Sequence, residues 1–137
     1  GLRLKPYGIQ VRDTVEEALW FLNDENDVRS SFYLELTATE YKVQGLEIDW
    51  ACICWDADLR RTKDDWDFKS FSGTTWQENK GLQERMFLLN TYRVLLTRAR
   101  EGIIVFVPQG DTSDYTRLPE FYDPIFSFLK DCGMKEF

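Results

Sequence analysis

The chain has 137 residues, 43% of them hydrophobic and 15% aromatic, which is enough for one domain with a packed core. Its 24 acidic residues outnumber its 17 lysines and arginines, and the formal net charge is −7. A free-standing nucleic-acid-binding module is therefore not expected, because such modules draw their affinity for phosphates from clustered cations.

The first predicted element is a short helix that ends near Asn23. Thr14 is its expected N-cap, acidic residues fill its first turn, and its apolar stripe consists of Val15, Ala18, Leu19 and Leu22. A strand is predicted next, over residues 32–37, because aromatic and β-branched side chains are frequent there.

A polar segment, residues 37–49, separates this strand from a second apolar run, residues 50–55. The segment contains Gly45 within a Gln-Gly-Leu-Glu turn. The run is apolar at every position, as expected for a strand that is covered on both faces. Two strands joined in this way indicate a parallel sheet with a working loop at a strand end, where open α/β sheets bind their ligands.

Asp56 and Asp58 close the second strand and give it the look of a Walker B strand, whose terminal acid holds a metal ion. The chain contains no GxxxxGK(S/T) loop to bind phosphates beside such a metal. We therefore interpret the two acids as solvated or loop-capping residues, and we assign no metal site.

Residues 59–77 combine charges and aromatic rings around a turn at Ser72 and Gly73, which predicts a hairpin or an irregular excursion from the sheet. We expect the aromatic rings to pack within the protein, because the neighbouring acids would repel the phosphates of a stacked nucleic acid. The rings in question are those of Trp66, Phe68, Phe71 and Trp76.

The longest predicted helix spans residues 82–100 and has Gly102 as its C-terminal cap. Arg93 and Arg100 share one helical stripe with Leu82, Met86, Leu89 and Leu96. Arg98 faces another side of the same helix. A strand over residues 103–107 is expected to follow it.

A last helix is predicted to begin with Asp123 as N-cap and Pro124 at its first position, and to end at Gly133. The face expected to cover the sheet carries Ile125, Phe128, Leu129 and Cys132.

The cysteines and the hydropathy bear on the location of the protein. The three cysteines cannot all pair with one another, and without any histidine they cannot form a mixed zinc site. No apolar stretch has the length of a membrane span, and no charged-then-apolar leader opens the sequence. We expect a cytoplasmic protein with reduced thiols and no membrane partner, and a chain beginning at Gly1 reads as part of a longer protein.

Two segments resemble motifs of superfamily one helicases of the UvrD and RecD type. Thr39, Tyr41, the run Gln44-Gly45-Leu46-Glu47 and Asp49 resemble motif V in their order and spacing. Residues 95–100, reading Leu-Leu-Thr-Arg-Ala-Arg before the strand 103–107, resemble motif VI. From residue 29 onward the chain is most similar to a helicase-like family related to the Schlafen helicase domain.

The resemblance implies the second RecA-like domain of a helicase: a P-loop NTPase fold without the P-loop, of α/β class, with a mostly parallel sheet flanked by helices and one domain over residues 1–137. In such motors ATP lies between two domains. The N-terminal RecA-like domain of the same polypeptide would bring the phosphate loop and Mg²⁺. Single-stranded nucleic acid would be the other partner, and it would bind the chain alone only weakly. The chain alone is expected neither to hydrolyse ATP nor to hold a cofactor.

The resemblance also assigns roles by position. Arg98 would be the catalytic arginine that reaches the γ-phosphate. Thr39 and Tyr41 would contact the nucleic acid, with Tyr41 standing where many relatives have histidine. Gln44 and Gly45 would form the coupling loop, and Glu47 would contact the nucleotide sugar. Together with Arg93 and Arg100, these three residues are the nucleotide-binding candidates.

Two alternatives belong to other functional classes. Glu40, Tyr41 and Lys42 read as the E-x-K half of a metal-dependent nuclease, with Asp24 or Asp27 as the upstream acid. A helicase-derived domain that kept its fold for protein interaction alone is the other alternative, because a fold does not determine a function.

Overall fold

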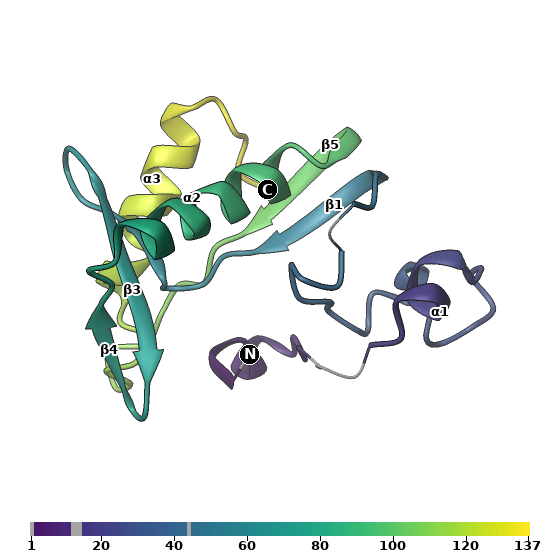
Figure 1. Cartoon of the computed structure of the whole chain (residues 1–137), viewed down its shortest axis with the longest axis horizontal. Coiled ribbons are helices and arrows are strands. Elements are labelled where there is room, and N and C mark those ends of the chain that lie inside the picture. The colour runs from purple at the N-terminus through teal and green to yellow at the C-terminus, as the bar shows by residue number, and fades with distance from the viewer. Residues whose placement is uncertain (1, 12–14, 44) are drawn as a thin grey trace. The chain divides into compact units, whose positions relative to one another are not determined.

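The structure is a computed structural model that describes residues 2–11, 15–43 and 45–137 (Figure 1). The chain divides into two compact units, Gly1–Glu47 and Ile48–Phe137. The larger unit contains both helices and strands, so the predicted α/β class is confirmed.

The first unit contains short helical elements joined by turns. These elements are the 3-10 helices η1 (Leu2–Tyr7) and η2 (Ser31–Tyr33) and the α-helix α1 (Glu17–Leu22). Asn23 ends α1, as predicted, and its backbone N–H donates to the carbonyl of Leu19. The helix begins after Glu16, whose side chain makes no capping bond, and the predicted N-cap Thr14 lies outside the described residues.

The predicted strand over residues 32–37 is wrong. Ser30 accepts a hydrogen bond from the Phe32 backbone and starts η2, and Leu34 then takes a left-handed conformation with φ of 55°. A leucine in that region interrupts extended backbone. The segment makes one isolated bridge, between Thr37 and Val11. It forms no longer strand, because no strand among the described residues pairs with it along its length.

The second unit contains two small sheets. Strand β1 (Ile48–Cys54) pairs in parallel with β5 (Ala99–Phe106), and β2 (Leu59–Arg61), β3 (Trp66–Ser72) and β4 (Thr75–Glu78) form an antiparallel sheet. The two apolar runs predicted as strands, residues 50–55 and 103–107, lie mostly within β1 and β5. The expectation that the first run is covered on both faces is wrong, because Trp50 and Cys52 are exposed while Ala51 and Ile53 are buried. The parallel part is smaller than expected, since three of the five strands are antiparallel.

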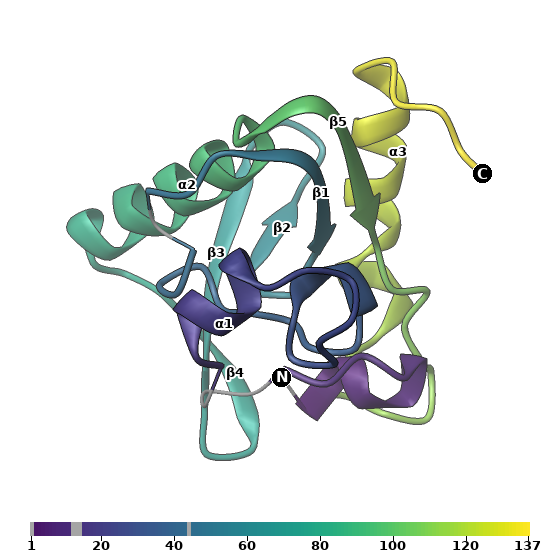
Figure 2. The ribbon, with the colours of Figure 1, turned by 90° about the vertical axis from the view of Figure 1, so that its right-hand side faces the viewer.

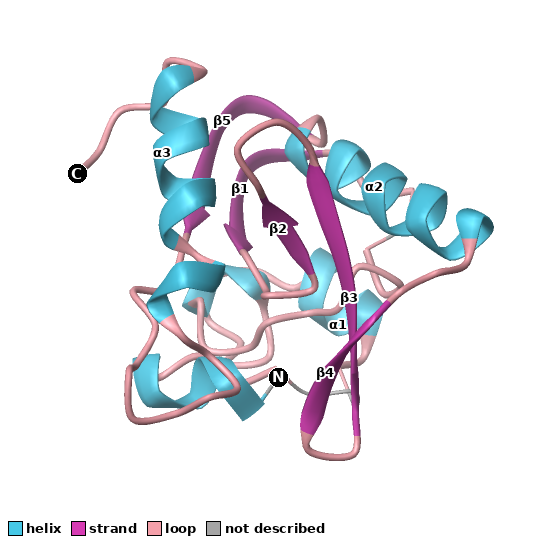
Figure 3. Ribbon diagram, turned by 90° about the vertical axis from the view of Figure 1, so that its left-hand side faces the viewer, coloured by secondary structure: helices cyan, strands magenta, loops and turns pink. Residues whose placement is uncertain are grey.

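The predicted excursion is a regular three-stranded sheet, and β3 and β4 form its long hairpin (Figure 3). Gly73 has φ of 62° at the turn, where glycine adopts a left-handed conformation without strain. Three of the four rings expected to pack, those of Trp66, Phe68 and Trp76, are partly buried, whereas Phe71 is exposed. Trp66 meets Phe128 edge to face at 5.3 Å, and the Trp76 indole donates a hydrogen bond of 2.7 Å to the Thr116 carbonyl.

The longest helix is shorter than predicted. Helix α2 spans Leu82–Leu96, and the Thr97 hydroxyl bonds back to the Arg93 carbonyl at 2.9 Å. The following residues enter β5 because Ala99 pairs with Ile48, a partner far away in sequence. Gly102 accordingly lies within β5 rather than capping the helix.

Helix α3 (Asp123–Asp131) begins one residue earlier than predicted, with Asp123 already helical and Tyr122 as the N-cap. Its last helical residue is Asp131, and Gly133 closes it, as expected. The Gly133 N–H donates to the carbonyl of Lys130 and the Met134 N–H to that of Leu129, which is the Schellman arrangement. Cys132 is exposed and so does not contribute to the packed face.

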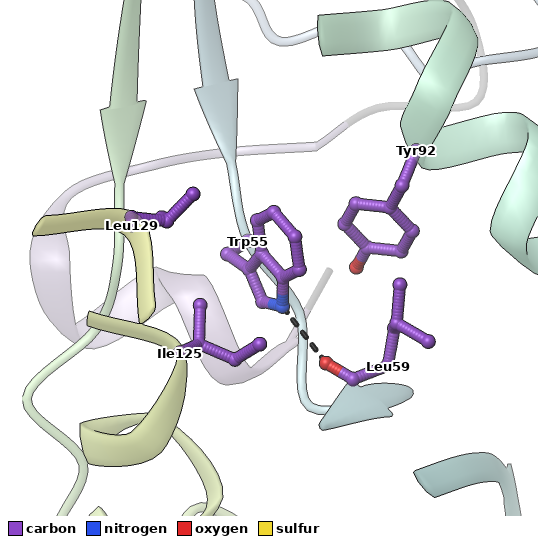
Figure 4. Close-up of a cluster of buried hydrophobic side chains, with 5 residues drawn as sticks. All are labelled: Trp55, Leu59, Tyr92, Ile125 and Leu129. Carbon is purple, nitrogen blue, oxygen red and sulfur yellow. Dashed lines mark hydrogen bonds between the residues drawn. The ribbon is translucent and has the colours of Figure 1, made fainter. Parts of the chain in front are cut away.

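Residues of both helices contribute to the hydrophobic core of the second unit. The two helices lie on either side of β1 (Figures 2 and 3). Trp55 is at its centre, 1% exposed, with its ring 4.3 Å from that of Tyr92 and its indole N–H bonded to the Leu59 carbonyl at 2.9 Å (Figure 4). Ile125 and Leu129 of α3 complete the buried cluster. The core thus fixes the strand β1 between α2 and α3.

Candidate helicase-motif site

The first candidate segment, residues 39–47, is a series of turns in the first unit. The Lys42 N–H donates to the Thr39 carbonyl at 3.0 Å, and Gly45 takes a left-handed conformation with φ of 86°. The Tyr41 side chain is 62% exposed, while Thr39 is half-buried and Glu47 exposed. Gln44 lies outside the described residues. The segment therefore presents an open loop directly before β1.

The residues of the nuclease alternative have other partners. The Lys42 ammonium lies 2.5 Å from the Glu17 carboxylate, and this bond holds the pKa of Glu17 below its usual value. Asp27 is bound by Arg29 at 2.6 Å, which lowers its pKa strongly. Among the described residues no group of three acidic, cysteine or histidine side chains is placed to hold a metal ion. The described geometry offers the nuclease alternative no support.

The three candidate arginines occupy three different environments in the second unit. Arg93 is exposed in the last turn of α2 and donates a hydrogen bond of 3.0 Å to Asn90. Arg98 is half-buried in the two-residue link between α2 and β5. Arg100 is exposed within β5. Arg98 and Arg100 thus lie outside the helix. The prediction that they face different sides of a helix is therefore wrong.

The parallel register places the ends of the two motif-like segments beside each other. Ile48, which follows Glu47 in the chain, pairs with Ala99, which follows Arg98. The next pair is Trp50 with Gly102, so two residues of β5 lie opposite Asp49 alone. Such a bulge re-aims side chains, and it lies at the amino ends of the strands rather than at the carboxyl ends where a ligand loop was predicted.

Two cross-strand contacts join β1 to β5 at the bulge. Arg100 lies 2.6 Å from the Asp49 carboxylate, and the Trp50 indole donates a hydrogen bond of 3.2 Å to Glu101. A Cβ built on Gly102 would come within 2.2 Å of the Trp50 ring, so glycine lets the ring lie across the strand. Both contacts are exposed at the surface.

The carboxyl end of β1 has a different set of polar contacts. The Tyr92 hydroxyl donates to the Asp58 carboxylate at 2.6 Å and accepts from the Asp56 backbone at 3.2 Å. Burial and the nearby Asp56 charge raise the pKa of Asp58 to about 6, although the bond from Tyr92 acts in the opposite direction. Asp58 is therefore a half-buried structural acid, while the Asp56 carboxylate caps the backbone of Ala57.

The structure thus brings Asp49 next to Arg100, and Arg98 to the start of the same strand as Arg100. The sequence named Asp49 within its motif but gave it no role, and it gave none to Trp50 or Tyr92. Knowledge of the register of the parallel strands would have identified Asp49 and Trp50. Tyr92 is 34 residues from Asp58, and no local pattern connects them.

Among the described residues, every helix is too short or too polar to serve as a membrane span. The family model described as "Schlafen group 3, DNA/RNA helicase domain" matches residues 5–109, which is more than half of the chain. Searches of curated proteins and of solved structures find no match. The matched region includes both motif-like segments and both strands of the parallel sheet. The chain belongs to the Schlafen group 3 DNA/RNA helicase domain family.

Proposed function

We propose that the chain is the second RecA-like domain of an ATP-dependent DNA or RNA helicase or translocase. It would supply the motif V coupling loop and the motif VI arginine to an ATP site that an N-terminal RecA-like domain of the same polypeptide completes. Family membership supports the helicase class. The observation that carries the finer proposal is the pairing of Ile48 with Ala99, which aligns the ends of the two motif-like segments at one edge of the sheet.

Arg98 is the arginine we assign to the transferring phosphate. It lies in the two-residue link between α2, which the core anchors through Tyr92, and the strand that pairs with β1. A guanidinium held between two anchored elements can stabilise the charge that develops on the γ-phosphate. Arg93 would contact the nucleotide from the last turn of α2.

The described residues suit a charge-supplying role and not a metal-binding one. They include no cluster of metal ligands, and the sequence has no phosphate-binding loop. We therefore assign the phosphates and Mg²⁺ to the N-terminal domain. Mg²⁺, when bound there, offsets the negative charge of the phosphates. The contribution of this chain to hydrolysis is then limited to the arginines and to the loop before β1.

That loop provides the proposed contacts to single-stranded nucleic acid and to the nucleotide. Tyr41 is exposed and has an aromatic face on which a base can stack. Thr39 would contact the backbone of the strand, Gln44 and Gly45 would couple it to the ATP site, and Glu47 would contact the nucleotide sugar. A cytoplasmic location fits the three cysteines, none of which forms a disulfide.

The test is ATP hydrolysis by the protein that contains this chain together with its N-terminal domain, measured with and without single-stranded DNA or RNA. We expect hydrolysis that either nucleic acid stimulates and that requires Arg98. A polypeptide that lacks a phosphate-binding loop and does not hydrolyse ATP would refute the proposal and support the protein-interaction domain instead.

A further inference from the structure

We propose that Asp49 and Arg100 form an interstrand clamp that holds the two motif-like segments in register, which makes Arg100 a positioning residue rather than a nucleotide contact. The inference rests on the proposed function, because it gives the clamp a part in setting the position of Arg98. It revises the nucleotide-binding role that the family resemblance implies for Arg100.

The clamp follows from the bulge in the parallel sheet. Between the pairs Ile48–Ala99 and Trp50–Gly102, β1 contributes Asp49 and β5 contributes both Arg100 and Glu101. The extra residue directs Arg100 toward β1, where its Nη2 atom lies 2.6 Å from Asp49 Oδ1. A guanidinium already paired with a carboxylate is partly neutralised, so it is a poorer ligand for a phosphate.

A second contact fixes the residue after Arg100 on the same strand pair. The Trp50 indole donates to the Glu101 carboxylate at 3.2 Å and lies against Gly102. Two neighbouring residues of β5 are thereby tied to two neighbouring residues of β1. Arg98 is two positions before Arg100, so the clamp limits where the Arg98 backbone can lie relative to β1.

The clamp is not expected to contribute much to stability. Asp49 and Arg100 are 58% and 61% exposed, and ion pairs in such positions add little to the free energy of unfolding. Positioning is more sensitive, since a displacement of a catalytic group by about 1 Å can reduce turnover ~10²-fold. The clamp should therefore affect turnover more than the melting temperature.

The first experiment is a double-mutant cycle on stimulated ATP hydrolysis by the complete protein. We expect Asp49→Ala and Arg100→Ala each to lower kcat about tenfold, with little change in KM for ATP, and the double variant to be no worse than either single one. The exchanged pair Asp49→Arg with Arg100→Asp should recover most of the activity. Lys130→Ala, which breaks the exposed pair of Lys130 with Glu136 at 2.9 Å on another surface, is the matched control and should leave kcat unchanged.

A different pattern would overturn the proposal. If Arg100 contacts the nucleotide, Arg100→Ala raises KM for ATP while Asp49→Ala does not, the two effects add, and the exchanged pair stays inactive. Additive losses in kcat without recovery in the exchanged pair also contradict a clamp, because they show that the two residues act independently.

Hydrogen exchange on the same variants separates this inference from the proposed function. Either single substitution should speed amide exchange at the starts of both β1 and β5, whether or not the protein hydrolyses ATP. Coupled exchange in a protein without ATPase activity would refute the proposed function and retain the clamp. ATPase activity without coupled exchange would retain the function and refute the clamp.

Discussion

Tyr92 on α2 and Asp58 after β1 are joined by a hydrogen bond of 2.6 Å, and the Tyr92 ring lies 4.3 Å from that of Trp55. Asp58 is half-buried, and its pKa is raised from 3.8 to about 6, first by burial and then by the charge of Asp56. The native state therefore retains a proton on Asp58 at pH values where the unfolded chain has already released it. Between about pH 4 and pH 6 this residue makes the protein less stable as the pH rises.

Asp58→Asn should remove this pH dependence. The amide oxygen can still accept the Tyr92 hydrogen bond, and no charge is buried at neutral pH. The difference in unfolding free energy between the variant and the wild type should grow from near zero at pH 4 to about 2–3 kcal/mol in favour of the variant at pH 7. Urea denaturation at a series of pH values measures it.

Asp58→Asn and the wild type must be compared at each pH, because other acids make the protein more stable as the pH rises. Hydrogen bonds from Ser113 and Thr116 lower the pKa values of Asp111 and Asp114, which lose stabilising contacts on protonation. Asp131→Asn, at the exposed end of α3, controls for the loss of one negative charge. An equal pH profile for Asp58→Asn and wild type would show that Asp58 is solvated.

Tyr92→Phe should destabilise the chain by about 1–3 kcal/mol at pH 7, because Asp58 loses its side-chain donor while the ring contact with Trp55 at 4.3 Å is retained. The same substitution should cost less in the Asp58→Asn background, where no buried carboxylate is left without a donor. Thermal or urea unfolding of the four proteins gives the coupling energy. Equal costs in both backgrounds would mean that the hydroxyl serves mainly the Asp56 backbone.

Arg98→Ala should abolish nucleic-acid-stimulated ATP hydrolysis in the complete protein. An arginine that acts on a transferring γ-phosphate can be worth ~10³–10⁵ in turnover. The melting temperature of the domain should change by only a few degrees, because the core is formed by other residues. Arg98→Lys should restore little activity, since an ammonium lacks the planar fork of a guanidinium. A variant that keeps more than about a tenth of the wild-type rate, against the ~10³-fold loss expected, would refute the assignment.

The isolated chain of 137 residues should fold without binding ATP tightly. It lacks the phosphate-binding loop, and its described residues include no cluster of metal ligands. Calorimetry with ATP and Mg²⁺ should show no micromolar affinity. A tight, saturable signal would indicate that the chain has a nucleotide site of its own.

The isolated chain should also bind single-stranded nucleic acid weakly, because its net charge is −7 and the proposed contact is one loop. Fluorescence anisotropy at physiological salt checks this. Tyr41→Ala should weaken the residual binding, whereas Tyr115→Ala, which removes a similarly exposed tyrosine from the second unit, should not. Submicromolar binding that persists after Tyr41→Ala would locate the contact elsewhere.

The sequence predicted the two strands that pair in parallel. Residues 50–55 and 103–107 are apolar on both faces, and both form the parallel pair. The segment 32–37 has a comparable composition but no full-length strand partner among the described residues, and it forms a turn with Leu34 in the left-handed region. Composition states what a segment can form, whereas pairing decides what it does form.

The end of α2 was misplaced for the same reason. Thr97 and Arg98 are compatible with a helix, and the decisive contact is the pairing of Ala99 with Ile48, which no local pattern reveals. The Asp49–Arg100 pair depends on that register and on its bulge. The assigned roles of Arg98, Thr39 and Tyr41 stay predictions, because they concern ligands and a second domain.

Helix α3 has a practical consequence for how the protein is produced. The family match ends at residue 109, yet Ile125 and Leu129, which lie beyond it, are two of the five side chains in the buried cluster. A polypeptide that stopped at the family boundary would expose Trp55 and Leu59 and would be expected to aggregate during expression. The boundary for expression should therefore follow Met134, whose backbone closes the helix and whose side chain packs against the cluster.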